Sequence, residues 1–202
     1  MRASLREEQK ALTRNRLLDA AVTVLAEKSI VDATMEDIAR AAGVTRVTVY
    51  AHFPGKGEIV QALAERLYGT MGEVFGGLAA IPHWTRPRVR TWLDDATARW
   101  REMVPTLRAV RLASPLVSRD STHARDRYVA AQESFVAALV EDAERWRDVP
   151  AAQAGQRALM AVLQTESFLS AWVVAGIPVP TDDPLDLLAD TLCHALGPAL
   201  GK

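Results

Sequence analysis

The chain has few of the residues that mark a disulfide-stabilised, metal-binding or catalytic protein. Its 202 residues include a single cysteine, Cys193, which cannot form an internal disulfide and does not belong to a cysteine cluster. The four histidines are too scattered for the spacing of a metal site; they are His52, His83, His123 and His194. The sequence also has no glycine-rich phosphate loop and no Gly-x-Ser-x-Gly motif. We therefore expect no enzyme activity, no bound metal and no other cofactor.

Long apolar runs and a charge of one sign are also missing. The first ten residues lack the apolar core of a signal peptide. The most apolar late stretch, residues 169–179, is interrupted by Gly176 and Pro178 and is too short to span a bilayer. We expect a cytoplasmic protein without a membrane partner. The formal net charge is −1, so any nucleic-acid function has to rest on local chemistry rather than on overall charge.

β-Strand signals are absent, and three- and four-residue spacing of apolar side chains predicts helices instead. Apolar residues make up 49% of the chain, enough for a packed core. The sequence therefore predicts an all-α fold of about nine helices, divided by Gly and Pro. The expected helices cover residues 7–28, 34–42, 45–53, 56–76, 88–103, 105–117, 122–146, 151–175 and 184–196.

Residues 34–53 carry the most specific pattern, TMEDIARAAGVTRVTVYAHF. Two short amphipathic helices flank a turn at Gly43, which is the layout of a helix-turn-helix motif. In this motif the second helix places its N-terminal residues against base edges in the major groove of DNA. Val49 and Phe53 are spaced to face a core. The opposite side carries polar groups suited to DNA: Arg46, Thr48, Tyr50 and His52.

These polar groups have the chemistry that duplex DNA requires. Arg46 can donate to O6 and N7 of one guanine. The hydroxyls of Thr45, Thr48 and Tyr50 can donate to phosphates. Lys56, at the start of the next helix, adds a charge and helix-terminal amides. A helix hairpin with an ordinary polar surface fits the pattern equally well.

The wider stretch from Thr13 to Leu67 resembles the DNA-binding domain of the tetracycline-repressor (TetR) family. The resemblance is carried by TRNRLLDAAVTVLAEKSI and ATMEDIARAAGVTRVTVYAHFPGKGEIVQAL. The rest of the chain matches that family only in length and helical layout. The resemblance implies an N-terminal three-helix helix-turn-helix domain followed by a C-terminal helical bundle for ligand binding and dimerisation. Together with the proline-punctuated connection at 81–88, it places the first domain at 1–55, a connecting helix at 56–76 and the second domain at 77–202.

The resemblance also implies roles for single residues. Arg46 matches a base-reading position, and Val47 matches a contact to a base or sugar. His52 matches a phosphate or groove contact. The positions that match phosphate-binding residues of the family are Thr34, Thr45, Thr48, Tyr50 and Lys56. Three positions depart from the family pattern: Ser29, Ala51 and Gly57.

The C-terminal half combines large apolar side chains with a few polar ones, as a ligand pocket does. Tyr128, Gln132 and Phe135 share one stripe of a predicted helix. For each candidate, packing in the core or at a dimer interface is the alternative. The candidate ligand-binding residues are Trp100, Met103, Tyr128, Gln132, Phe135, Met160 and Gln164.

The last two long helices match the family's four-helix dimer interface. Glu166 stands out in the first of them, because an isolated carboxylate is costly to bury unless it is paired. We rank an arginine across the dimer interface first as its partner, with a cationic or hydroxylated ligand and solvent as alternatives. The predicted interface residues are Phe168, Leu169, Trp172, Val173, Leu185, Leu188, Leu192 and Leu196.

The expected function is a ligand-responsive DNA-binding transcriptional regulator. By the resemblance it is a repressor, released from a palindromic operator when a small molecule shifts the population of its conformations. The expected partners are duplex DNA, a second copy of the chain and a small-molecule effector. The alternatives are a helical interaction module, a regulator without a small-molecule ligand, and an activator.

Overall fold

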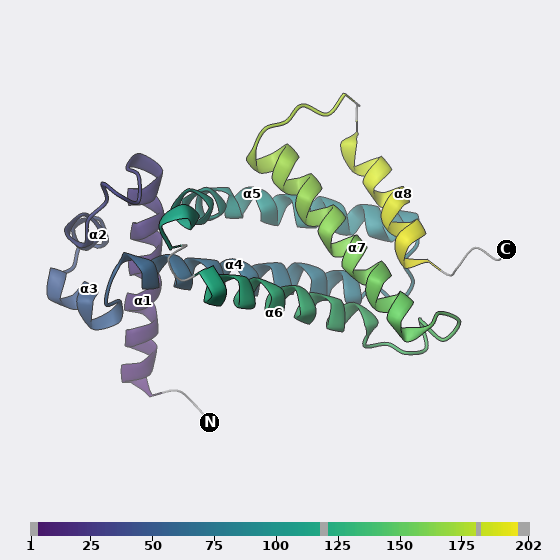
Figure 1. Ribbon diagram of the computed structural model, residues 1–202, viewed down its shortest axis with the longest axis horizontal. Coiled ribbons are helices and arrows are strands. Elements are labelled where there is room, and N and C mark those ends of the chain that lie inside the picture. The colour runs from purple at the N-terminus through teal and green to yellow at the C-terminus, as the bar shows by residue number, and fades with distance from the viewer. Residues whose placement is uncertain (1–3, 118–120, 181–182, 198–202) are drawn as a thin grey trace. The chain divides into compact units, whose positions relative to one another are not determined.

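The computed structural model describes residues 4–117, 121–180 and 183–197, except the side chains of 114–117 and 121–122. The described residues within 1–67 and 105–124 form one compact unit, and those within 68–104 and 125–202 form a second. Every regular element in the described ranges is helical, with eight α-helices and one π-helical turn. The all-α prediction is therefore confirmed (Figure 1). The predicted functional division at residues 55 and 77 stays a prediction.

The first unit begins with α1, Leu5–Glu27, which starts at a capping box. The Ser4 hydroxyl accepts from the Glu7 amide at 3.3 Å, and the Glu7 carboxylate accepts from the Ser4 amide at 2.7 Å. This reciprocal pair satisfies amides that have no partner inside the helix. The second half of α1 buries a stripe of Leu17, Ala21 and Val24, so this half anchors the unit.

Two short helices follow, α2 at Met35–Ala42 and α3 at Arg46–His52. Gly43 ends α2 with φ of 62°, in the left-handed region that favours glycine. A Cβ at this position would also lie 2.7 Å from Nη2 of Arg16. The tight turn between α2 and α3 therefore depends on Gly43, as the sequence predicts.

One apolar core holds the three N-terminal helices in place. Ile38 of α2, Val49 of α3 and Leu17 of α1 are at most 2% exposed and belong to this core. α4, Lys56–Ala79, adds Leu63 from its first half. The end of α5, Arg86–Val117, adds Ala109 to the same cluster. The buried side of α3 therefore packs in one core with side chains of α1, α2, α4 and α5, and this packing fixes its orientation within the unit.

The second unit contains the rest of α4 and α5 together with three further helices. These are α6 at Ser121–Val140, α7 at Ala151–Leu169 and α8 at Pro184–Leu196, with the π-helical turn η2 at Ser170–Val174 directly after α7. Phe75 of α4 packs against Trp92 of α5 and Phe135 of α6, with ring centroids 6.2 and 5.2 Å apart. Aromatic packing therefore joins α4, α5 and α6.

Charged side chains fasten α8 to its neighbours in the second unit. Arg90 of α5 pairs with Asp183 at 2.5 Å and with Asp186 at 3.1 Å. Arg157 of α7 donates to the carbonyl of Ala195 at 2.6 Å and to the carbonyl of Gly197. These donors satisfy carbonyls that the last turn of a helix leaves without a partner.

The predicted boundaries of three helices are wrong. One helix, α5, replaces the expected pair 88–103 and 105–117, which reduces nine helices to eight. The chain stays helical through Pro105 although proline offers no amide to the carbonyl of Arg101. Buried Met103 and Thr106 on either side anchor this part of the helix. α4 likewise continues past the predicted end at residue 76 to Ala79.

The third error concerns the end of α6, expected at 146 and observed at Val140. Trp146 lies in the following turn, is 5% exposed, and donates its Nε1–H to the carbonyl of Leu139 at 3.0 Å. This donor caps the end of α6, which explains why an apolar residue follows outside the helix. No helix among the described residues is long and apolar enough to cross a membrane.

Candidate functional site

The surface of α3 is built from its first residue. The Thr45 hydroxyl accepts from the Thr48 amide at 3.2 Å and so caps the helix. The Thr48 hydroxyl lies 2.9 Å from that of Thr45. On the opposite side, Val49 is fully buried and Phe53 is 1% exposed. The capped end and the buried side together hold the polar side of α3 toward solvent.

Arg46 and Tyr50 lie one turn apart on that polar side. Nη2 of Arg46 donates to the Tyr50 hydroxyl at 3.4 Å, and the guanidinium carbon lies 5.3 Å from the centre of the Tyr50 ring. Tyr50 is exposed and Val47 is 79% exposed. Val47 and Arg46 therefore present an apolar contact and a forked donor on one surface.

Thr34 has a local role that the sequence indicates. Its hydroxyl accepts from the Asp37 amide at 3.1 Å and donates to the Asp37 carboxylate at 2.8 Å. Nζ of Lys28 lies 2.8 Å from the same carboxylate. The hydrogen bonds from Lys28 and Thr34 hold the pKa of Asp37 far below its usual range. The hydroxyl of Thr34 is therefore already used in capping α2.

Lys56 is placed differently from the expectation of a free phosphate-binding amine. Its Nζ donates to the carbonyls of Ile30, Val31 and Ala33 at 2.7, 3.1 and 2.7 Å. An ammonium group has three N–H donors and all three are used here. The amine therefore fastens the α1–α2 connection to the start of α4. Its phosphate contact stays a prediction that no contact in the structure tests.

A basic groove lies between the first half of α1 and the end of α3. It has a volume of about 500 Å³. Burial lowers the pKa of His52, and the positive charges of Lys10 and Arg14 lower it further. The sequence interpretation missed the α1 side, although Arg6, Lys10 and Arg14 stand four residues apart and so share one helix face. The residues that line the groove are Arg6, Glu7, Gln9, Lys10, Thr13, Ala51 and His52.

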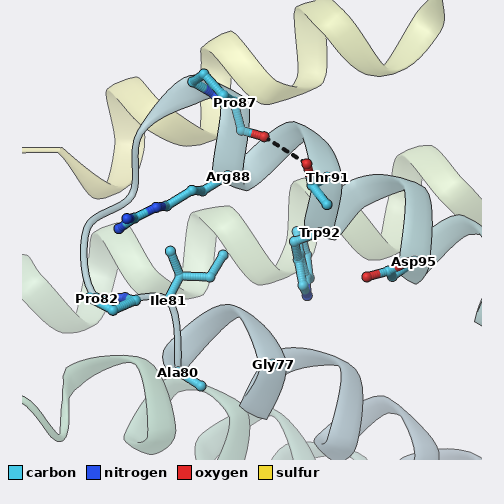
Figure 2. Close-up of a pocket in the computed structure, with 9 residues that line it drawn as sticks. All are labelled: Gly77, Ala80, Ile81, Pro82, Pro87, Arg88, Thr91, Trp92 and Asp95. Atoms are coloured by element: carbon cyan, nitrogen blue, oxygen red, sulfur yellow. Dashed lines mark hydrogen bonds between the residues drawn. The ribbon is translucent and has the colours of Figure 1, made fainter.

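The second unit has a groove of about 540 Å³ beside the α4–α5 connection (Figure 2). Figure 2 shows Ile81 and Pro82 from the connection on one side and Trp92 and Asp95 from α5 on the other. Arg88 and Asp95 are the charged residues in an otherwise mostly apolar lining. None of the predicted ligand-binding residues lines this groove.

The predicted ligand-binding residues differ in burial, and their role in a pocket stays a prediction. Trp100, Met103 and Phe135 are buried core residues, at most 6% exposed. Met160 is 53% exposed and lies on the outside of its unit, which does not fit a place inside a pocket. Gln164 lines a separate apolar groove of about 240 Å³, with Phe168, Val179, Pro184, Leu187, Leu188 and Thr191.

Gln132 and Glu166 are brought together from α6 and α7. Nε2 of Gln132 lies 3.0 Å from Oε1 and 2.9 Å from Oε2 of Glu166. Burial raises the pKa of Glu166, and the hydrogen bond from Gln132 opposes that shift. From the sequence, an arginine of a second chain is the first-ranked partner of Glu166. The structure gives this carboxylate a partner within its own chain, and an arginine across a dimer interface stays a prediction.

Five of the eight predicted dimer residues are buried inside the subunit. Leu169, Leu185, Leu188 and Leu192 are at most 6% exposed, and so is Leu196. These residues pack α7 and α8 into their own unit. Helical spacing predicts that a face is buried, but it does not tell which chain buries that face. Phe168 and Trp172 are partly exposed, with ring centroids 6.0 Å apart. Val173 is also partly exposed. The exposed apolar side chains of α7 and α8 are Leu159, Met160 and Leu187.

The helix-turn-helix region of the chain is similar in sequence to known proteins. Residues 17–63 match the family described as bacterial regulatory proteins, tetR family. The HTH-type transcriptional regulators TtgW and SrpR of Pseudomonas putida are each 53% identical over 51 residues. That match covers 25% of this chain in both cases, and 38% of TtgW and 24% of SrpR. Each of these two matches in sequence therefore covers about a quarter of this chain.

Solved structures extend the likeness to the whole fold. The SmeT–triclosan complex has a TM-score of 0.67 at 21% identity, covering 91% of both chains. A TetR-family regulator from Mesorhizobium loti has a TM-score of 0.64 at 17% identity, covering 93% of this chain and 94% of that one. NalD, the secondary repressor of the MexAB-OprM multidrug efflux pump in Pseudomonas aeruginosa, has a TM-score of 0.55 at 22% identity, covering 93% and 96%. At these identities the likeness establishes the fold.

Proposed function

We propose that this chain, whose residues 17–63 match the tetR family of bacterial regulatory proteins, is a DNA-binding transcriptional regulator. It acts as a homodimeric repressor that a small molecule releases from a palindromic operator. Regulators of this kind act on genomic DNA, so we place the protein in the cytoplasm. The observation that carries the proposal is the exposed polar side of α3, held by a capped first turn and a buried opposite side.

Arg46 and Val47 read bases in this proposal. The guanidinium of Arg46 has five N–H donors, of which the Tyr50 hydroxyl uses one at 3.4 Å. The remaining donors suit O6 and N7 of a guanine. The Val47 side chain, 79% exposed, suits the methyl group of a thymine.

Other groups around α3 contact the phosphates. The hydroxyls of Thr45, Thr48 and Tyr50 serve as donors on α3 itself. Arg6 and Lys10, together with His52, form a basic edge at the end of α3. Lys56 contributes through the amides of the first turn of α4, since its amine is used by three carbonyls. Thr34 contributes through the start of α2 in the same way.

Two structural relatives support a ligand-controlled repressor. SmeT is known in complex with triclosan, and NalD is a repressor of an efflux pump. In our proposal the second unit binds the effector and also forms the dimer. Exposed Leu159, Met160 and Leu187 with the partly exposed Phe168 and Trp172 offer an apolar surface on α7, α8 and η2 for a second copy of the chain.

Selection from a random duplex library tests the proposal. We expect the purified chain to enrich one palindromic sequence, to which it binds far more tightly than to unrelated duplex. Arg46→Ala should then lower affinity for this operator by about 1–3 kcal/mol and relax base preference at one position in each half-site. Fluorescence anisotropy with single-base operator variants measures both effects.

Arg111→Ala is the matched control, because Arg111 is an exposed arginine of the same unit on α5, outside the helix-turn-helix. It should leave affinity and base preference unchanged. Equal losses for Arg46→Ala and Arg111→Ala would remove Arg46 from base reading. A library from which no sequence is enriched at low salt would overturn the proposal as a whole.

A further inference from the structure

The contact between Gln132 and Glu166 has more hydrogen-bond acceptors than donors. The amide nitrogen of Gln132 is committed to both carboxylate oxygens, at 3.0 and 2.9 Å. Gln132 is 7% exposed, and its buried Oε1 has no hydrogen-bond partner among the described residues. A carboxylate also accepts more than the two contacts it receives here. Buried acceptors without donors are costly, so this arrangement favours a further donor beyond those of the described residues.

The carboxylate is also without a countercharge. Among the described residues, no Lys, Arg or His side chain forms an ion pair with Glu166, and its hydrogen-bond donor is the neutral amide of Gln132. On the same helix, Val162 lies one turn before Glu166 and is fully buried. A half-buried carboxylate in such surroundings is stabilised by a cation that enters beside it.

Two tyrosine rings lie within electrostatic reach of the same carboxylate. Tyr68 of α4 and Tyr128 of α6 have ring centroids 6.4 Å apart at an interplanar angle of 56°. Burial raises the pKa of both tyrosines, and the negative charge of Glu166 adds to both shifts, while Arg127 lowers the pKa of Tyr68. Tyr128 is 40% exposed, so one edge of the cluster is open to solvent. Aromatic faces attract cations as the carboxylate does.

We propose that Glu166, Gln132, Tyr68 and Tyr128 form a binding site for a protonated primary amine that carries an apolar, aromatic body. The ammonium donates to Glu166 and to Oε1 of Gln132 and lies against the tyrosine rings. The aromatic body packs toward Phe135, one turn from Gln132 on α6 and 5.2 Å from Phe75 between ring centroids. This inference rests on the proposed function in one respect only, that the amine acts as the effector.

The acceptor atoms of Glu166 and Gln132 should distinguish a primary ammonium from a quaternary ammonium and from an alcohol. A quaternary ammonium satisfies the charge of Glu166 and the tyrosine rings but has no N–H for Oε1 of Gln132. An alcohol of the same shape can donate but carries no charge. The site should therefore prefer the primary ammonium over both.

Isothermal titration calorimetry of the full chain tests the site with 2-phenylethylammonium as the probe. We expect binding at least about 10-fold tighter than that of 2-phenylethanol or of the N,N,N-trimethyl derivative. Glu166→Gln should weaken binding of the ammonium by about 10- to 100-fold, as expected for loss of a charged hydrogen-bond partner. It should leave binding of the alcohol unchanged.

Glu133→Gln is the matched control, since Glu133 is exposed and adjacent to Gln132. It should bind the ammonium as the wild type does. If Glu166→Gln does not fold, Tyr128→Leu replaces it, because Tyr128 is partly exposed, and it should lower the preference for the ammonium over the alcohol several-fold. Equal binding of ammonium and alcohol by the wild type would overturn the inference. So would a Glu166→Gln variant that changes from dimer to monomer but keeps its affinity for the ammonium.

Operator binding in the same samples separates the two proposals. A wild-type protein that binds its operator but does not prefer the ammonium refutes the amine site alone. A preference for the ammonium in a protein that selects no operator supports the amine site and refutes the regulator. Release of the operator by 2-phenylethylammonium in the wild type, but not in Glu166→Gln, supports both.

Discussion

Single side chains near α3 differ in how much of their hydrogen-bonding capacity the fold has already used. Arg46 has five donors and engages Tyr50 through one of them. Lys56 has three donors and gives all three to carbonyls of the α1–α2 connection. Lys10 lies exposed on the open side of the basic groove. These three basic residues all carry a positive charge, but the fold gives them different roles.

Lys56→Met should destabilise the first unit more than it alters DNA recognition. The variant leaves the carbonyls of Ile30, Val31 and Ala33 without their charged donor, at a cost of about 2 kcal/mol. Urea unfolding monitored by circular dichroism measures this loss. At low temperature, where the variant is folded, its base preference should equal that of the wild type.

Lys10→Met is the reciprocal variant. It should leave the free energy of unfolding nearly unchanged, because Lys10 is exposed. It should weaken binding to all duplexes alike and reduce the slope of log affinity against log salt by about 1. A Lys56→Met protein with wild-type stability would show that the three carbonyl contacts contribute nothing.

For single residues, the sequence predicts which side chains are exposed better than it predicts their hydrogen-bond partners. The exposed position of Val47 follows from the burial of Val49, because residues two positions apart lie on nearly opposite sides of a helix. The fastening role of Lys56 does not follow, because its partners are backbone carbonyls 23 to 26 residues earlier. Every residue has such a carbonyl, so no side-chain pattern marks the contact.

Among the elements, the short N-terminal helices are those that the sequence predicts best. Thr34, Gly43 and Thr45 act on residues at most four positions away, so their effect is local. α5 and α6 are predicted less well. Helix α5 continues through Pro105, and α6 ends six residues before Trp146, because tertiary burial outweighs local signals at both places.

The faces of α7 and α8 show the same limit. Periodicity identifies Leu188 and Leu192 as buried but does not say whether their own chain or a second copy buries them. In the structure their own unit does so. The neighbouring Leu187 is 67% exposed and lines the apolar groove that Phe168 and Gln164 also line. We therefore propose Leu187 rather than Leu188 as a contact between subunits.

Leu187→Glu should convert the dimer into monomers without unfolding them. An unpaired carboxylate at a dimer interface costs on the order of 3 kcal/mol, which raises the dissociation constant of the dimer by about 100-fold. Sedimentation equilibrium measures the constant, and circular dichroism verifies the helical content.

Leu12→Glu is the control, since Leu12 is 69% exposed on α1 in the other unit. It should remain dimeric. A Leu187→Glu protein that sediments as a dimer at all concentrations would move the interface away from the end of α8.

Over the whole molecule, positive and negative charges nearly balance, and basic residues gather near the proposed reading surface. The formal net charge is −1, yet Arg6, Lys10 and Arg46 belong to the helices around the proposed reading surface. A balanced chain with a basic edge avoids general attraction to DNA and relies on contacts at one surface. One such surface of seven residues is small, so useful affinity requires two of them on one duplex.

Two copies of α3 on one face of the duplex set the geometry of the operator. A twofold dimer reads half-sites about 10 base pairs apart, centre to centre, because successive major grooves face the same side at that spacing. Insertion of five base pairs between the half-sites turns one of them to the opposite side. We expect this insertion to lower the affinity of the wild type at least 10-fold, measured by fluorescence anisotropy, and insertion of ten to lower it less. The monomeric Leu187→Glu protein should bind all three spacings equally, because its single α3 reads one half-site at a time. Equal affinity of the wild type for all three operators would contradict paired reading by a twofold dimer.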